Sequence, residues 1–326
     1  MKIIKWIKEN WLYGFLVILA CFLFLFPLPY TIEGPGGLIA VGDRFQIDGM
    51  DTNMQYYLAY VSEYKATPMT YLHAKLHKNY EITPKSEQVG TDKEMNFRNH
   101  LMLEEANQDA LIYAYLKAEK KVDILEEEIY VTLIDALAKT NLEIGDKIIT
   151  INGEKVKDKA HLFSIIQSAN ERLELEVESE GKREEKYAIL FDVEGTKKIG
   201  ILPTVKRKIQ VEPEIEFIFD KSESGASGGF MMTLAIYDAL TNSNFSKNKK
   251  IAGTGTIDGD GNIGEIGGIK YKILGALEEK ADLFFVPIEN YEEALKTLKE
   301  NEGKMQLIKV SHFEEALSYL EESKVK

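Results

Sequence analysis

The pattern of hydrophobic and polar positions along this chain has two periods, and together they predict a mixed α+β fold. Residues 94–121 carry apolar side chains at helical spacing, which predicts a long amphipathic helix. Shorter helices are predicted over 67–77, 159–169, 228–240, 269–280 and 291–301, with a last one opening at a capping box of Ser311 and Glu314. Strands are predicted over 38–47, 55–63, 128–134, 173–178, 185–191, 211–219, 250–257 and 283–287. Gly34 to Gly37 is predicted to form a turn.

Residues 11–30 contain no charged side chain and are rich in Leu, Phe, Ile and Val. About 20 such residues in a helix match the thickness of a bilayer's hydrocarbon core. Lys2, Lys5 and Lys8 precede this run, and the positive-inside rule then leaves the N-terminus in the cytoplasm. The pattern predicts an uncleaved, single-pass transmembrane anchor in the cell membrane, with everything after residue 30 extracytoplasmic. A cleaved signal peptide is the alternative.

Composition and charge restrict the partners of the remaining chain. The net charge of -13 argues against nucleic acid, because binding a phosphate backbone requires a basic surface. Cys21 is the single cysteine, and no metal-binding pattern surrounds the histidines, so neither a disulfide nor a metal site is expected. The sequence also contains no phosphate-binding loop of the G-x-x-x-x-G-K-[ST] type, so no ATP site is expected.

The middle of the chain contains a recognisable hairpin. Residues 142–153 read L-x-x-G-D-x-I-x-x-I-N-G, with Asn152-Gly153 as a tight hairpin turn. With the strands and helix predicted around it, this segment resembles a PDZ domain. The resemblance implies a PDZ fold over residues 122–198 that binds an extended peptide at a sheet edge. A PDZ fold that serves only as a spacer is the alternative.

The first chemically suggestive segment surrounds Ser227. Small residues on both sides, Gly225-Ala226-Ser227-Gly228-Gly229, lead into an apolar helix. Such a turn lets a substrate backbone approach closely, and its free N–H groups can hold a developing oxyanion. Ser227 is therefore a candidate nucleophile, with Gly225, Ala226 and Gly228 as oxyanion and substrate-binding positions. A simple helix cap is the alternative.

The second suggestive segment is Gly267-Gly268-Ile269-Lys270, at the start of another helix. On a helical wheel, Lys270 falls at the centre of an apolar face, and Lys272 falls on the opposite side with Glu279. Desolvation of an inward lysine would lower its pKa, so that a neutral amine can accept a proton. The wheel therefore predicts Lys270 as the general base and Lys272 as a solvated side chain. The alternative is a Lys270 that extends out to solvent from the helix start.

The two segments together resemble the proteolytic domain of Lon peptidases. Members of that family carry a G-P-S-A-G nucleophile turn and a downstream G-G-[LI]-K motif. Thr254, in A-G-T-G-T-I, matches a threonine of the family near its Ser–Lys dyad, and residues 102–110 are similar to an early helix of the family. The resemblance implies a catalytic dyad of Ser227 and Lys270 with Thr254 beside it. Ala226 and Gly228 depart from the family's turn.

The whole chain is similar to bacterial membrane-anchored, PDZ-containing Lon-like Ser–Lys peptidases. This implies a cytoplasmic segment (1–10), an anchor (11–30) and a PDZ domain (122–198) inserted in a Lon-type domain made of 31–121 and 199–326. The implied function is that of an ATP-independent serine endopeptidase, without a cofactor, that cuts unfolded or membrane-proximal extracytoplasmic polypeptides. The alternative is a catalytically inactive, membrane-tethered adaptor that binds peptides through its PDZ domain.

Overall fold

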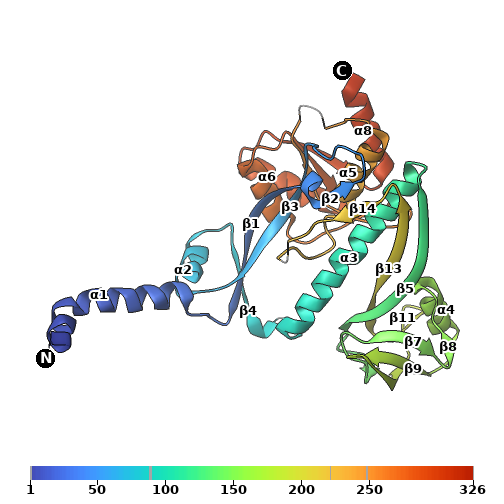
Figure 1. The fold of residues 1–326 in the computed structure, drawn as a ribbon, viewed down its shortest axis with the longest axis horizontal. Helices are drawn as coiled ribbons and strands as arrows, with labels where there is room; N and C mark the ends of the chain where they lie inside the picture. The colour runs from blue at the N-terminus through green and yellow to red at the C-terminus, as the bar shows by residue number, and fades with distance from the viewer. Residues whose placement is uncertain (1, 88–89, 221, 247–248, 326) are drawn as a thin grey trace.

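Two β-sheets and one long helix organise the chain in the computed structural model (Figure 1). The structure describes residues 2–87, 90–220, 222–246 and 249–325. At residues 2–9, 87, 324 and 325 it describes the backbone alone.

The first sheet combines strands from both ends of the chain in the order β19-β18-β15-β3-β1-β4. These strands are β1 (Tyr30–Ala40), β3 (Tyr56–Lys65), β4 (Glu81–Pro84), β15 (Ile251–Gly253), β18 (Leu283–Pro287) and β19 (Gln306–Val310). β15 lies parallel to β3 and to β18, whereas β1 is antiparallel to β3 and β4. Residues 30–84 and 251–310 therefore form one body, although more than 160 residues of chain separate them.

Helices cover both faces of this sheet. Phe284 and Phe285 alternate on β18 and belong to different hydrophobic clusters, so each marks one face. The Phe285 face packs against α3 (Asp92–Lys117), α5 (Gly229–Thr241) and α8 (Phe313–Val325). The Phe284 face packs against α6 (Ile269–Glu278) and α7 (Tyr291–Glu300). α5 and α6 thus lie on opposite faces, and the loops before them line one cavity near the end of the inner strand β15.

The packing of α6 on β1 is unusually close. Gly275 faces the strand, where a Cβ added to it would lie 2.8 Å from the backbone nitrogen of Gly37. The predicted turn at residues 34–37 is wrong, because this segment is extended and belongs to β1, with an irregularity between Pro35 and Gly37. One turn further on, Glu279 Oε1 accepts a hydrogen bond from the Leu38 N–H (2.7 Å). The strand therefore covers this side of α6.

Two predicted strands are interrupted near the loop that precedes α5. The predicted strand 38–47 is broken by η1 (Val41–Arg44), after which β2 (Phe45–Ile47) pairs with β14 (Ile215–Phe217). The predicted strand 250–257 is divided into β15 and β16 (Thr256–Ile257), and β16 pairs with β17 (Ile263–Gly264). Thr254 and Gly255 stand at this second break, where their polar groups are available for contacts outside the sheet ladder.

A second sheet is formed by the middle of the chain in the order β13-β5-β7-β9-β10-β6, with β8 paired to β7. Its elements are β5 (Lys121–Ile134), β6 (Lys139–Thr140), β7 (Lys147–Ile151), β8 (Glu154–Lys155), α4 (Lys159–Ser168), β9 (Arg172–Ser179), β10 (Lys182–Ile189) and β13 (Ile201–Glu212). Asn152 and Gly153 both have positive φ angles and close the β7–β8 hairpin. This sheet packs on α4 around its own hydrophobic cluster. A PDZ identity for this unit stays a prediction.

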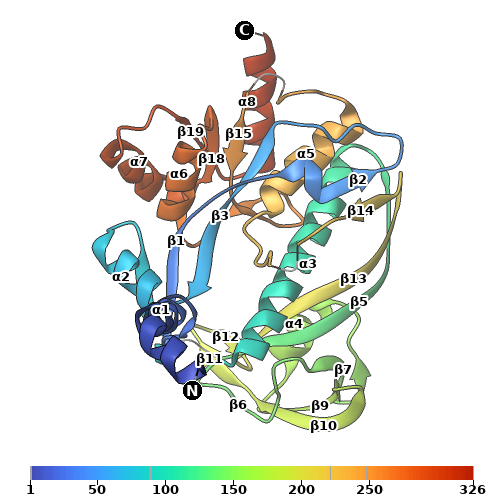
Figure 2. The ribbon, with the colours of Figure 1, turned by 60° about the vertical axis from the view of Figure 1, so that its left-hand side comes forward.

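The long strands β5 and β13 run beside α3 and connect the second sheet to the rest of the fold (Figures 1 and 2). Arg207 on β13 forms an ion pair with Asp109 on α3 (2.7 Å) and another with Glu127 on β5 (2.9 Å). The remaining elements are α2 (Pro68–Leu76), η2 (Lys85–Glu87), η3 (Ile288–Asn290) and the pair β11 (Phe191–Val193) and β12 (Thr196–Lys198). The ion pairs of Arg207 thus join α3 to the second sheet, and the hydrophobic cluster around Phe285 joins α3 to the first.

The N-terminal helix α1 (Lys2–Leu25) corrects the prediction of a membrane anchor. Among the residues that the structure describes, no helix is both long and apolar enough to cross a bilayer. The predicted transmembrane helix over 11–30, and with it the single-pass placement in a cell membrane and the extracytoplasmic body, is overturned. The reason is that α1 ends at Leu25, and Tyr30 already begins β1. Leu28 and Tyr30 pack instead against a small buried cluster with Ile32.

The tight contact between α6 and β1 yields a prediction about stability. Replacing glycine by alanine inside a helix normally stabilises it. Gly275→Ala is expected instead to lower the free energy of unfolding by about 1–3 kcal/mol, because its Cβ would collide with the Gly37 backbone. Urea denaturation measures this, with Gly259→Ala as control, since a Cβ at Gly259 meets no atom within 4 Å. An unchanged or raised stability for Gly275→Ala would contradict the close packing.

Candidate active site

Ser227 lies directly before α5, and its backbone is fixed by the break between β15 and β16. The carbonyl oxygen of Ser227 accepts hydrogen bonds from the Gly255 N–H (2.8 Å) and the Thr254 hydroxyl (3.0 Å). Gly255 in turn accepts a hydrogen bond from the N–H of Phe230, in the first turn of α5 (3.1 Å). Two segments distant in sequence therefore hold the Ser227 side chain at the mouth of the helix.

The lysine beside Ser227 is Lys272, from the first turn of α6. Its Nζ lies 2.7 Å from Ser227 Oγ and 2.9 Å from Thr254 Oγ1. The side chain is almost completely buried, with 3 % of its surface exposed. Burial lowers the pKa of Lys272 from its ordinary value to about 7, because the charged form loses its hydration. Near neutral pH, a substantial fraction of this amine is therefore uncharged.

The hydrogen bonds around Lys272 orient its lone pair. Thr254 uses its hydroxyl proton on the Ser227 carbonyl, so its oxygen lone pairs accept an N–H of Lys272. A neutral amine that donates to Thr254 can then accept the hydroxyl proton of Ser227. No carboxylate forms an ion pair with Lys272 within the described part of the chain. The arrangement thus keeps the amine basic without holding it in its charged form.

The predicted placement of Lys270 is wrong. Its side chain is partly exposed, and its Nζ donates a hydrogen bond to the Lys78 carbonyl (3.0 Å), away from Ser227. The helical wheel assumed that the side of α6 opposite Lys270 faces water. In the structure β1 covers that side, so Lys272 is enclosed. Gly275 and Ala276, small residues on the Lys272 side of the helix, were the available signal that another element approaches there.

The loop before Ser227 presents backbone donors. The N–H of Gly225 donates to the Asn99 carbonyl (3.1 Å), so it is already engaged. The N–H groups of Ser227 and Gly228 have no hydrogen-bond partner among the described residues. Ala226 contributes its carbonyl to the N–H of Gly229 (3.3 Å). Of the predicted oxyanion positions, the N–H of Gly225 is therefore engaged, whereas the N–H groups of Ala226, Ser227 and Gly228 remain candidates among the described residues.

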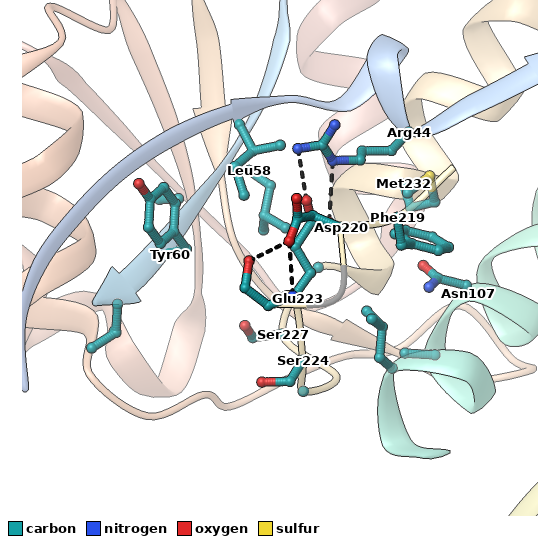
Figure 3. Close-up of a pocket in the computed structure, with 18 of the residues that line it drawn as sticks. Arg44, Leu58, Tyr60, Asn107, Phe219, Asp220, Glu223, Ser224, Ser227 and Met232 are labelled. Atoms are coloured by element: carbon teal, nitrogen blue, oxygen red, sulfur yellow. Dashed lines mark hydrogen bonds and ion pairs between the residues drawn. The ribbon is translucent and has the colours of Figure 1, made fainter. Parts of the chain in front are cut away.

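An ion pair holds the other end of the same loop. Glu223 receives two contacts from the Arg44 guanidinium, at 2.7 Å and 3.1 Å (Figure 3). Both side chains are mostly shielded from solvent, and such a two-point contact restrains orientation as well as distance. Because Arg44 belongs to η1, the break in the predicted strand 38–47 serves to anchor the loop that carries Ser227.

Two cavities meet at Ser227. The first, called here the α3 pocket, has a volume of about 530 Å³ and lies between β3, α3 and the loop before α5 (Figure 3). Its lining includes Leu58, Leu103, Ala106, Asn107, Ser227, Gly228 and Met232. The second, called here the lysine pocket, has a volume of about 540 Å³. Its lining includes Glu33, Glu63, Asn96, Ser227, Gly268 and Lys272. Ser227 is therefore accessible from two sides.

The lysine pocket is acidic on the side of the sheet. Glu33 on β1 is paired in register with Glu63 on β3 and with Glu81 on β4. Burial and these two neighbouring carboxylates raise the pKa of Glu33. Within the described residues, no three histidine, cysteine, aspartate or glutamate side chains are grouped closely enough to hold a metal ion.

A serine hydroxyl in contact with a buried amine of lowered pKa, beside free backbone donors, is the arrangement of a serine hydrolase. Residues 221–322 match the family model of the Lon protease (S16) C-terminal proteolytic domain. The matched segment contains Ser227, Thr254 and Lys272, and it supports a serine peptidase. No curated protein matches the chain. The strands β1 and β3, which enclose α6, precede the matched segment.

The lowered pKa of Lys272 predicts a pH-dependent stability. Between pH 7 and about 10, the unfolded chain binds one more proton at Lys272 than the folded chain does, so stability rises with pH in this window. Lys272→Met removes this contribution. Its free energy of unfolding should exceed that of the wild type by about 1–4 kcal/mol at pH 7, and the difference should shrink toward pH 10.

Urea denaturation at pH 7 and pH 9.5 measures both effects. Lys270→Met, which removes a lysine from the same turn without touching Ser227, is the matched control. An equal stability difference for Lys272→Met at the two pH values would show that Lys272 is not buried in its neutral form.

Proposed function

We propose that this protein is a serine endopeptidase with a catalytic dyad of Ser227 and Lys272. The observation that carries the proposal is the 2.7 Å contact between Ser227 Oγ and Nζ of Lys272. Burial lowers the pKa of this lysine to about 7, so its amine is partly neutral near pH 7. A family match to a proteolytic domain over residues 221–322 supports the same reaction class. Lys272 thus takes the role that the sequence pattern assigned to Lys270.

In the proposed reaction, the neutral amine of Lys272 removes the hydroxyl proton of Ser227 as Oγ attacks a peptide carbonyl. The N–H groups of Ser227 and Gly228 receive the oxyanion of the tetrahedral intermediate. The ammonium of Lys272 then donates its proton to the leaving amine, and an ester with Ser227 remains. Lys272, neutral again, activates a water molecule that releases the acid and restores the hydroxyl.

Thr254 is proposed as a positioning residue for this proton transfer. It holds the carbonyl of Ser227 and the amine of Lys272 at once, through contacts of 3.0 Å and 2.9 Å. Its single hydroxyl therefore aligns the nucleophile's backbone with the base. Removing it frees the lysine rotamer and leaves one more N–H without a partner in a buried site.

The proposed substrates are flexible polypeptides rather than folded domains. This sequence contains no phosphate-binding loop, so the proposal includes no ATP-driven unfolding. An extended strand of substrate is required to place a carbonyl at Ser227 between the two cavities. We further propose that residues 122–198 form a PDZ domain that contributes peptide binding, supported by the L-x-x-G-D motif and the Asn152-Gly153 hairpin.

Substitutions at the dyad test the proposed function. Ser227→Ala is expected to lower the hydrolysis of unfolded casein at least about 10³-fold, and Lys272→Met about 10²–10⁴-fold. Lys270→Met is expected to retain activity, because its Nζ contacts the Lys78 carbonyl and the ring of Tyr271 rather than Ser227. Cleavage is followed by release of fluorescent peptides. Full activity in Lys272→Met with loss in Lys270→Met would reverse the assignment.

The same dyad predicts the pH profile. Only the neutral amine is a base, so kcat/KM should rise with pH to a plateau, with a midpoint at about 7. Thr254→Val should lower kcat by about tenfold or more, whereas Thr254→Ser, which keeps the hydroxyl, should restore most of it. A profile that shows no midpoint near neutral pH would contradict a base with the environment of Lys272.

A further inference from the structure

Asn107 is a buried residue in the wall of the α3 pocket, and its amide nitrogen has no partner among the described residues. Only 4 % of the residue is exposed, and its Nδ2 forms no hydrogen bond among the described residues. The side chain extends from α3 into the pocket, on the side of Phe219 and Met232 (Figure 3). An unsatisfied buried donor destabilises a fold, and such groups in native proteins call for an explanation. A ligand that supplies the missing hydrogen-bond acceptor would explain why the Asn107 donor is unpaired.

The two cavities at Ser227 differ in the part of a substrate that each can hold. The leaving amine must receive its proton from Lys272, so the leaving half of the peptide lies on the side of the lysine pocket, which Lys272 lines. The N–H of Gly228 is a candidate for the oxyanion, and Gly228 lines the α3 pocket. The side chain of the residue that supplies the scissile carbonyl, the P1 residue, therefore enters the α3 pocket.

The α3 pocket combines apolar walls with polar residues, among them the carboxylates of Glu63, Asp220 and Glu223. Leu58, Leu103, Ala106 and Met232 provide hydrocarbon walls. At its rim, the positive charge of Arg44 is engaged by Glu223, so it does not attract an anionic side chain. A carboxylate in this pocket would be desolvated beside Glu223, which is unfavourable. The Asn107 donor instead suits a neutral acceptor at the end of a methylene stem.

We propose that Asn107 is a specificity-determining residue, whose Nδ2 donates a hydrogen bond to the side-chain carboxamide oxygen of a P1 glutamine. This inference rests on the proposed peptidase function and names a substrate preference for it. Recognition of this type disfavours a substrate that lacks the acceptor, because such a substrate leaves the buried donor unpaired. Methionine, with a similar stem length and only a weak acceptor, is the matched competitor.

Three fluorogenic peptides that differ only at P1 test the proposal, carrying Gln, Met or Glu. The wild type is expected to cleave the Gln peptide with a kcat/KM at least about tenfold above the Met peptide, and Glu least. Asn107→Leu should reverse the Gln-to-Met order, and Asn107→Ala should abolish the preference. Asn96→Leu, an asparagine of the same helix that lines the other cavity, should leave the ratio unchanged whatever it does to the rate.

Unfolded casein offers every P1 residue, so its cleavage tests the peptidase activity separately from the role of Asn107. If casein is cleaved but the wild type favours Met, or if Asn107→Leu keeps the wild-type ratio, the role of Asn107 is overturned and the peptidase stands. If neither casein nor any peptide is cleaved by the wild type, both fall. Asn107→Ala removes atoms without adding bulk, so it provides the ratio even if the leucine variant misfolds.

Discussion

The site depends on keeping one lysine amine out of water. Lys272 lies against Ser227 and Thr254, and no carboxylate of the described residues forms an ion pair with it, so the cost of desolvation falls on its charged form. β1, β3 and the loop before α5 surround the side chain and leave only 3 % of the residue exposed, on the side of the lysine pocket. A lysine that could reach the surface would retain its proton and could not serve as a base near neutral pH.

This enclosure is assembled from parts of the chain that are far apart in sequence. The Thr254 hydroxyl and the Gly255 N–H both donate to the Ser227 carbonyl, while β1 packs against α6, the helix that carries Lys272. β1 can approach α6 only because Gly275 has no side chain to collide with the Gly37 backbone. Residues 30–65 therefore contribute to the site mainly by excluding water from the side of α6 that carries Lys272. Residues 221–322, which match a proteolytic domain, share one sheet with β1 and β3, which lie outside the match.

The sequence pattern predicted that Ser227, Thr254 and Lys270 lie together, whereas the structure places Lys272 rather than Lys270 against Ser227 and Thr254. Ser227 and Thr254 are marked by local chemistry, since small residues flank both of them. Lys270 and Lys272 are two positions apart on one helix, and only burial distinguishes them. The helical wheel assumes a single wet face, yet residues 271–276 are buried on all sides. The anchor prediction failed for a related reason, because it counted apolar residues across the point at which α1 ends and β1 begins.

The sequence by itself determined most of the elements and the candidate nucleophile: most helices, the Asn152-Gly153 hairpin and a serine in a glycine-rich turn before an apolar helix. These features depend on residues within a few positions of one another, which periodicity and turn chemistry report directly. The tertiary structure alone decided which lysine meets Ser227, how the two cavities divide around it, and that Nδ2 of Asn107 is buried without a partner among the described residues. Each of these is set by contacts between segments distant in the chain, where solvent access depends on the neighbouring element rather than on the local pattern.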